Sequence, residues 1–200
     1  MSPRAYRSPV REAASSETRA RILEAARSLL SQSGPAAFTI DAVAAAADVA
    51  RMTVYNQFGS KTGLVEALSD DLAVRGGIRR LPEAFTAEDA MTGVAILVEV
   101  FTSLWSRERA LVRPLRALAL LDPELARSNR DLRRRQALTV LIRRLASETG
   151  RPAPADQAAA IDLLLALTSF ETYENLAAGR SEAAVAQILV YAARRLLGSS

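Results

Sequence analysis

The chain has 200 residues, half of them hydrophobic, and a formal net charge of +4, which suits one domain or a small domain followed by a medium one. It contains no cysteine and no histidine, which excludes disulfides, thiol chemistry, Cys–His catalysis and nearly all zinc sites. The sequence also lacks a carboxylate cluster with ligand spacing and a glycine-rich phosphate loop. We therefore expect no enzymatic activity, no metal and no cofactor.

Residue preferences indicate an all-α protein. Aromatic residues make up only 5% of the chain, so the core must be built from Ala, Leu and Val. Ala and Leu are strong helix formers, and the residues that favour strands are sparse. No apolar run reaches the roughly 18 residues that would span a membrane, and we expect the protein to be cytoplasmic.

Residues 1–16 are rich in Ser, Pro, Arg and Ala, and they predict a disordered basic arm. The arginines of this arm would allow it to reach along a DNA backbone or into a minor groove. Glu12 and Glu17 dilute its charge and favour a solvated tail without a partner. Both interpretations stay open, with the solvated tail preferred.

The next segment, residues 18–30, predicts an amphipathic helix with Ile22, Ala26 and Leu29 on one side. Gly34 follows as a stop signal. Residues 38–61 then predict two short helices joined by a tight turn near Asp48. Apolar or small residues mark the inner faces of these two helices: Ile40, Val43, Ala44 and Ala47 on the first, and Val49, Val54 and Phe58 on the second.

The outer face of the second short helix carries hydrogen-bond donors and no acid. These side chains are the kind that a helix needs when it enters the major groove of DNA. Most of the basic excess also falls in this part of the chain, since residues 1–61 hold eight Arg or Lys and five Asp or Glu. The outward residues are Arg51, Thr53, Tyr55, Asn56 and Gln57.

Three motifs in register carry a resemblance to a known family. They are Thr-Arg-x-x-Ile-Leu-x-Ala-Ala at 18–26, Phe-Thr at 38–39, and Val-Tyr-x-x-Phe-x-Ser-Lys-x-x-Leu at 54–64. Over about residues 17–72 the chain resembles the TetR family of transcriptional regulators. The family usually has Gly where this chain has Asp48, a turn residue that tends toward a left-handed backbone, which Asp tolerates at some cost.

The resemblance implies a DNA-binding domain with three helices, a helix-turn-helix, over residues 17–62. It implies a helical effector-binding and dimerisation domain over residues 63–200. Ser60 is expected to cap the helix that follows the motif.

The chemistry of the outer face suggests a role for each side chain. Arg51 could pair with guanine O6 and N7, and Asn56 or Gln57 with adenine. Thr53 and Tyr55 stand where the family contacts phosphates and thymine methyls. The expected phosphate contacts are Thr39 and Lys61, with Arg19 and Arg21 as weaker candidates.

Residues 91–105, 110–121 and 123–147 predict further helices. Pro114 should either lie in the first turn of its helix or kink it. The many arginines of 123–147 could form a second nucleic-acid patch. We prefer the interpretation that they cover the solvated side of a helix whose leucines face the core. A linker is expected at 151–154.

The last two predicted helices, at 157–178 and 183–197, are apolar on more than one face. A helix that is apolar nearly all round must be buried all round, which predicts packing against the same helices of a second chain. The TetR resemblance implies the same arrangement for its last two helices. The expected interface residues are Leu163, Leu167, Phe170, Glu174, Ile188 and Tyr191.

The middle helices resemble the family's effector-binding region, which encloses a pocket. An ordinary core is the competing interpretation, since Phe101 and Trp105 lie four residues apart on one helix face. The candidate lining residues are Phe101, Thr102, Trp105, Arg116, Thr168 and Thr172.

These observations predict a homodimeric, sequence-specific repressor that a small apolar ligand releases from a palindromic DNA operator. Two alternatives belong to other classes of protein. One is a non-specific or architectural DNA-binding protein. The other is a helical small-molecule-binding protein or enzyme that does not read DNA.

Overall fold

A computed structural model of the chain describes residues 9–121, 125, 130–150 and 157–198. Those residues form helices and turns without a β-strand, and the expected all-α fold is confirmed. Contacts divide the chain into two compact units: residues 1–71 with 113–126, and residues 72–112 with 127–200. Within the described ranges, no helix is both long and apolar enough to cross a membrane.

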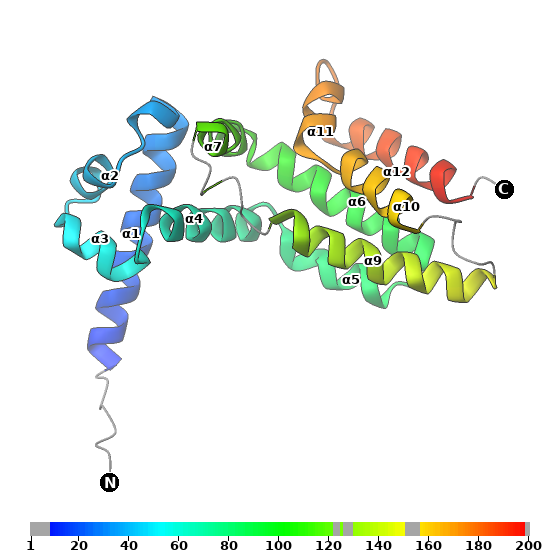
Figure 1. Ribbon diagram of the computed structural model, residues 1–200, viewed down its shortest axis with the longest axis horizontal. Helices are drawn as coiled ribbons and strands as arrows, with labels where there is room; N and C mark the ends of the chain where they lie inside the picture. The colour runs from blue at the N-terminus through cyan, green and yellow to red at the C-terminus, as the bar shows by residue number, and fades with distance from the viewer. Residues whose placement is uncertain (1–8, 122–124, 126–129, 151–156, 199–200) are drawn as a thin grey trace, which may run out of the picture. The chain divides into compact units, whose positions relative to one another are not determined.

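The first unit is built around a long N-terminal helix, with two short helices beside it (Figure 1). The second of these short helices leads through Gly59 and Ser60 into α4, whose last residues belong to the second unit. The elements are α1 (Pro9–Ser33), the 3-10 turn η1 (Pro35–Ala37), α2 (Ile40–Ala46), α3 (Arg51–Phe58) and α4 (Lys61–Arg75).

Helix α1 begins earlier than the sequence indicated. Residues 9–16, which we expected in a disordered arm, form the first two turns of α1, while residues 1–8 lie outside the described part of the chain. Pro9 suits a first helical position because its missing N–H has no partner there. The Glu-Ala-Ala run at 12–14 then favours continuation of the helix.

The inner faces of α2 and α3 form most of the core that the sequence predicted. The expected residues are buried except for two that are half-buried, Val49 and Phe58. The buried ones are Ile40, Val43, Ala44, Ala47 and Val54. Asp48 in the intervening turn has φ 51°. The expected left-handed turn is therefore present, with an Asp in a conformation that glycine adopts more easily.

The second unit packs around α6, which contacts α5, α9, α11 and α12 (Figure 1). α10 in turn contacts α9 and α12. Helix α7 joins the two units, because its residues from 113 onward are counted with the first. The elements are η2 (Ile78–Arg80), α5 (Leu81–Thr86), α6 (Ala90–Arg107), α7 (Arg109–Leu121), α9 (Arg130–Thr149), α10 (Gln157–Leu167), α11 (Phe170–Leu176) and α12 (Glu182–Gly198).

Pro114 lies inside α7, beyond its first turn, which leaves a kink as the remaining alternative of the two that the sequence offered. Two other predictions for these helices need correction. The helix expected over 157–178 is broken: Ser169 starts α11 as an N-cap whose hydroxyl oxygen accepts from the Thr172 amide. Arg134 is buried and does not lie on a solvated face. The expected linker at 151–154 lies outside the described residues.

Candidate nucleic-acid interface

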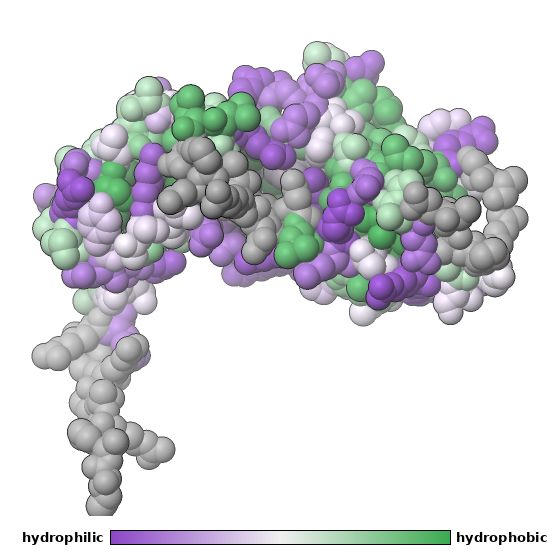
Figure 2. Space-filling model, viewed as in Figure 1, coloured by the Kyte–Doolittle hydropathy of each residue, from purple (hydrophilic) through white to green (hydrophobic). Residues whose placement is uncertain are grey.

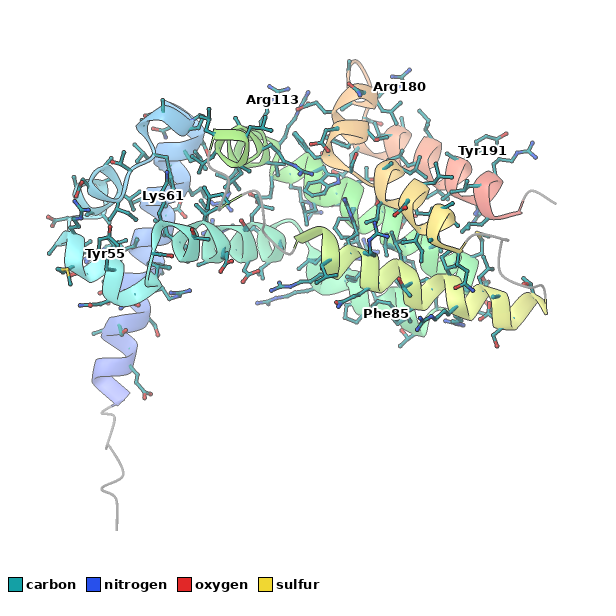
Figure 3. All side chains as sticks on the ribbon, viewed as in Figure 1. Tyr55, Lys61, Phe85, Arg113, Arg180 and Tyr191 are labelled. Atoms are coloured by element: carbon teal, nitrogen blue, oxygen red, sulfur yellow. The ribbon has the colours of Figure 1, made fainter. Side chains whose placement is uncertain are left out.

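The outward face of α3 presents a mixed polar and apolar surface. Arg51, Met52 and Asn56 are exposed, while Thr53 and Tyr55 are half-buried. Val54 points inward to the core. Because of the helical period, the residues on the opposite side of α3 then face outward. Figure 3 labels Tyr55 on α3 and Lys61 at the start of α4.

Arg51, the expected guanine reader, has partners within the first unit. Its Nη1 donates to both carboxylate oxygens of Asp41, at 3.1 and 3.0 Å, and its Nη2 donates to the Tyr55 hydroxyl at 3.3 Å. The hydrogen bond with Tyr55, followed by the charge of Asp41, raises the pKa of Arg51 above its ordinary value. The guanidinium is therefore charged and lies between α2 and α3, on exposed partners.

Thr39 is the N-cap of α2. Its Oγ1 accepts a hydrogen bond from the Ala42 amide at 3.1 Å, which satisfies a backbone donor in the first turn. The side chain is exposed. Because a hydroxyl both accepts and donates, the proton of Thr39 can still be donated to a phosphate oxygen.

Gln57 and Arg19 are placed differently from their expected roles. The Gln57 amide nitrogen donates to Oγ of Ser15 on α1 at 3.0 Å, so its side chain turns toward α1. Arg19 Nη1 donates to the Gln57 carbonyl at 2.9 Å, and its guanidinium lies over the Phe58 ring. These contacts hold the end of α3 against α1. They occupy the Gln57 amide, which was expected to pair with adenine, and the Arg19 guanidinium, which was expected to bind phosphate. Arg21, the other weak candidate, is exposed.

Lys61 opens α4 directly after α3 ends. Ser60 caps α4 as the sequence predicted, since its Oγ accepts from the Gly63 amide at 3.0 Å. Gly63 lies so close to α3 that a Cβ there would be 2.1 Å from the Phe58 carbonyl oxygen. This close approach fixes Lys61 relative to α3.

Two residues of this face were missing from the sequence-based set. Met52 on α3 is 64% exposed, and an apolar side chain there suits contact with a thymine methyl. Asp41 comes from α2 and meets Arg51 across the two helices. The exposed apolar residue could have been found from the helical period, whereas the ion pair depends on how the helices cross.

The six candidate pocket residues do not all belong to one unit. Arg116 is counted with the first unit, and the other five with the second. Thr102 and Thr168 are buried, and their hydroxyls donate to backbone carbonyls four residues earlier, at 2.8 and 2.7 Å. Thr172 likewise donates to the Ala166 carbonyl at 2.6 Å. These hydroxyls are engaged by the backbone.

The aromatic candidates form a chain of ring contacts in the second unit. Trp105 lies between Phe101 and Phe170, with ring centroids 5.9 and 5.8 Å away. Trp105 Nε1 and Arg134 Nη1 both donate to the Thr168 carbonyl, at 2.9 and 2.7 Å. This carbonyl lies where α10 stops, so side-chain donors replace the helical partner that the break removes.

The surface expected to dimerise is partly exposed. Leu163 on α10 and Ile188 and Tyr191 on α12 are exposed, and Leu167 is half-buried. Phe170 does not belong to this surface, because it is buried against Trp105 within the single chain. Glu174 pairs with Arg109 of the same chain. Hydrophobic residues reach the surface over α10 and α12 in Figure 2, and Tyr191 points outward in Figure 3.

Comparison with known proteins places the helix-turn-helix in a family. Residues 22–68 match the model of the bacterial regulatory proteins, tetR family. The HTH-type transcriptional regulator AlkX of Mycobacterium tuberculosis is 41% identical over 69 residues, which are 34% of this chain and 33% of AlkX. The match therefore spans about a third of the length of that relative.

Solved structures extend the likeness of fold to nearly the whole chain. A TetR-family transcriptional regulator from Pectobacterium atrosepticum is 26% identical, with a TM-score of 0.59 and 96% of both chains covered. FadR from Bacillus subtilis, in complex with stearoyl-CoA, is 17% identical, with a TM-score of 0.66, 90% of this chain and 98% of that chain covered. The helix-turn-helix region, residues 22–68, is therefore that of the bacterial regulatory proteins of the tetR family, and nearly the whole chain shares the fold of a TetR-family transcriptional regulator.

Proposed function

We propose that the protein is a homodimeric transcriptional repressor that binds a palindromic DNA operator and leaves it when a small apolar ligand binds. The observation that carries this proposal is the outward face of α3. It presents Arg51, Met52 and Asn56 on a helix that contains no acid. Such a helix can enter a major groove without charge repulsion from the DNA.

Base reading is assigned to the exposed side chains of α3. Arg51 has the donor geometry for guanine, and Asn56 has the amide that pairs with adenine. Gln57 is less suited to read adenine, because its side-chain amide donates to Ser15 Oγ. The exposed side chain of Met52 would contact a thymine methyl.

Phosphate binding is assigned to residues around this face. The exposed Thr39 hydroxyl retains a proton to donate, and the Tyr55 hydroxyl accepts from Arg51 while its own proton is also available. Lys61 would add a cation at the junction of α3 and α4. These contacts would fix the protein on the duplex without reading its sequence.

A dimer would supply the second half of the operator. One short helix reads few base pairs, and two related by a two-fold axis read a palindrome. The exposed apolar side chains of α10 and α12 support an interface there. Leu163, Ile188 and Tyr191 are its preferred members.

A ligand would act on the second unit, and its chemistry would be apolar. The aromatic side chains there are accompanied by threonines whose hydroxyls are engaged by backbone carbonyls. The likeness in fold to FadR, which was crystallised with stearoyl-CoA, supports an apolar chain as the first class to test. A ligand that weakens DNA binding must itself bind less tightly to the DNA-bound protein by the same factor.

The decisive experiment is selection of bound sequences from a random duplex pool. A palindromic consensus is expected for the wild type. Arg51→Ala should relax the preference at one base pair in each half-site, at a cost of about 1–3 kcal/mol. Lys61→Ala should weaken all sequences alike and flatten the salt dependence.

Two outcomes would contradict the DNA-binding part of the proposal. Binding spread evenly along DNA, without a consensus, would identify a non-specific binder. Absence of binding at low salt would favour a helical small-molecule-binding protein.

For the ligand, acyl-CoAs, which carry an apolar chain on a charged head, and wholly apolar compounds would be screened by thermal shift and then titrated into the protein–operator complex. A compound that stabilises the protein and leaves operator affinity unchanged would contradict the switch.

A further inference from the structure

The first turn of α2 places an acid against the expected guanine reader. Arg51 Nη1 lies 3.1 and 3.0 Å from the two oxygens of Asp41, and Nη2 lies 3.3 Å from the Tyr55 hydroxyl. The guanidinium carbon is 5.6 Å from the centroid of the Tyr55 ring. Both charged side chains are exposed, at 58% for Arg51 and 66% for Asp41.

An exposed ion pair of this kind is easily exchanged. Water screens its charges, so the pair stabilises the fold little. Arg51 can therefore leave Asp41 for another acceptor when that acceptor offers comparable geometry. Guanine presents two acceptors on its major-groove edge, N7 and O6, which match the fork of a guanidinium, whereas no other base presents two acceptors there.

The carboxylate also changes what Arg51 contributes to binding without sequence preference. Non-specific affinity comes from cations that replace counterions at phosphates. While Arg51 remains on Asp41, its charge is compensated, and the Asp41 charge is itself repelled by nearby phosphates. Arg51 would therefore add little to the protein's affinity for a DNA sequence that lacks guanine at the position it reads.

We propose that Asp41 is a specificity-determining residue, which withholds Arg51 from DNA until a guanine takes its guanidinium. This inference rests on the proposed DNA-binding function. Asp41 itself reads no base: it acts through Arg51 and is a positioning residue. Asp41 could also have a purely structural role, since an acid in the first turn of a helix stabilises that helix. The test must therefore measure more than folding.

The experiment uses the full chain with two duplexes of equal length, the selected consensus and a scrambled sequence, titrated over a range of KCl concentrations. Asp41→Asn removes the charge with little change in shape. Its non-specific affinity should rise about two-fold or more for a dimer, since an exposed pair is worth about 1.4-fold to five-fold per protomer. Its salt slope should steepen by about one per protomer. Consensus affinity should change less, so the ratio of the two affinities falls.

Glu66→Gln is the matched control. Glu66 is an exposed acid on α4 of the same unit, so the variant changes the net charge by the same amount without touching Arg51. A second control is Asp41→Asn in an Arg51→Gln background. There it should raise non-specific affinity no more than Glu66→Gln does. Asp41→Ser serves the same purpose as Asp41→Asn if the latter fails to fold.

The outcomes separate this inference from the function on which it rests. If Asp41→Asn and Glu66→Gln raise non-specific affinity equally, general charge explains the effect and the role of Asp41 is refuted. The role of Asp41 is also refuted if Asp41→Asn raises the ratio of consensus to scrambled affinity. It is refuted as well if Asp41→Asn raises non-specific affinity by the same factor in the Arg51→Gln background as in the wild type. A wild type that binds no DNA contradicts both proposals, whereas a wild type with a clear consensus and a silent Asp41→Asn contradicts only this one.

Discussion

Arg19 on α1 holds its guanidinium over the ring of Phe58 at the end of α3, 4.3 Å from the ring centroid. The same side chain donates from Nη1 to the Gln57 carbonyl at 2.9 Å. That carbonyl lies in the last turn of α3, where helical partners are missing. Arg19 is therefore better placed to hold α3 than to bind a phosphate.

Arg19→Met should loosen α3 while keeping the length of the side chain. The lost cation–π contact and charged hydrogen bond predict a cost of about 1–2 kcal/mol. Hydrogen exchange of the α3 amides should become correspondingly faster. Operator affinity should fall without any change in the selected consensus. Arg21→Met, at an exposed position on the same helix, is the control, and equal exchange rates in the two variants would contradict the assignment.

Gly63→Ala should disturb the junction between α3 and α4. The added Cβ would lie 2.1 Å from the Phe58 carbonyl oxygen and 3.2 Å from its carbon, and backbone atoms cannot move aside as a flexible side chain does. We expect a loss of about 1–3 kcal/mol in stability and weaker operator binding. Thermal denaturation would measure the first, with Gly198→Ala as the control because nothing lies within 4 Å of its added Cβ. A Gly63→Ala variant as stable as that control would show that the helices separate freely.

Met52 should read a thymine methyl. If it does, replacing one thymine of the consensus by uracil should weaken wild-type binding about four-fold, the value of one buried methyl group. Met52→Ala should bind the two duplexes equally. Each thymine of a half-site would be replaced in turn and affinity measured by titration. Wild-type affinity that is insensitive at every thymine would exclude this contact.

The fold of the helix-turn-helix could be predicted because it depends on local signals. Ile40, Val43 and Val54 recur with the helical period, and all three are buried. The turn was marked by its own residue, Asp48, which has a positive φ as expected. The helical spacing of apolar residues indicates which face of a helix is buried.

Contacts that a side chain makes with a residue distant in the sequence could not be predicted in the same way. The pairs Asp41–Arg51 and Arg19–Gln57 join residues 10 and 38 positions apart, and their meeting depends on the angles between helices. Arg134 is the clearest failure, since a run of arginines indicates a solvated face. It is buried because the Thr168 carbonyl, at a helix break that the sequence did not reveal, accepts its hydrogen bond.

Asp89 should make the second unit sensitive to acid. It caps α6 by accepting from the Thr92 amide at 2.7 Å and the Thr92 hydroxyl at 3.0 Å. These hydrogen bonds, the amide first, lower the pKa of Asp89 below its ordinary value. The charged cap therefore stabilises the fold fully above the unfolded pKa of about 3.9, and this contribution is lost as the pH falls through the lowered pKa.

Melting temperatures measured from neutral pH down to acid pH, below the unfolded pKa of Asp89, test its role. The gap between wild type and Asp89→Ala should be widest near neutral pH and should close in acid. Asp89→Asn keeps a good N-cap without the charge, so it should retain most of the neutral stability and lose the pH dependence. A gap of constant width would show that the carboxylate charge contributes nothing.

Leu163 and Ile188 should hold the dimer, since both are apolar and both remain exposed on α10 and α12, at 52% and 40%. The double variant Leu163→Glu/Ile188→Glu should sediment as a folded monomer and lose most operator affinity, because two half-sites are then bound separately. Val140→Glu, at a similarly exposed position on α9, should remain dimeric. Phe170→Glu cannot serve in this test, because Phe170 is buried and its replacement should unfold the unit. A double variant that still sediments as a dimer would place the interface elsewhere.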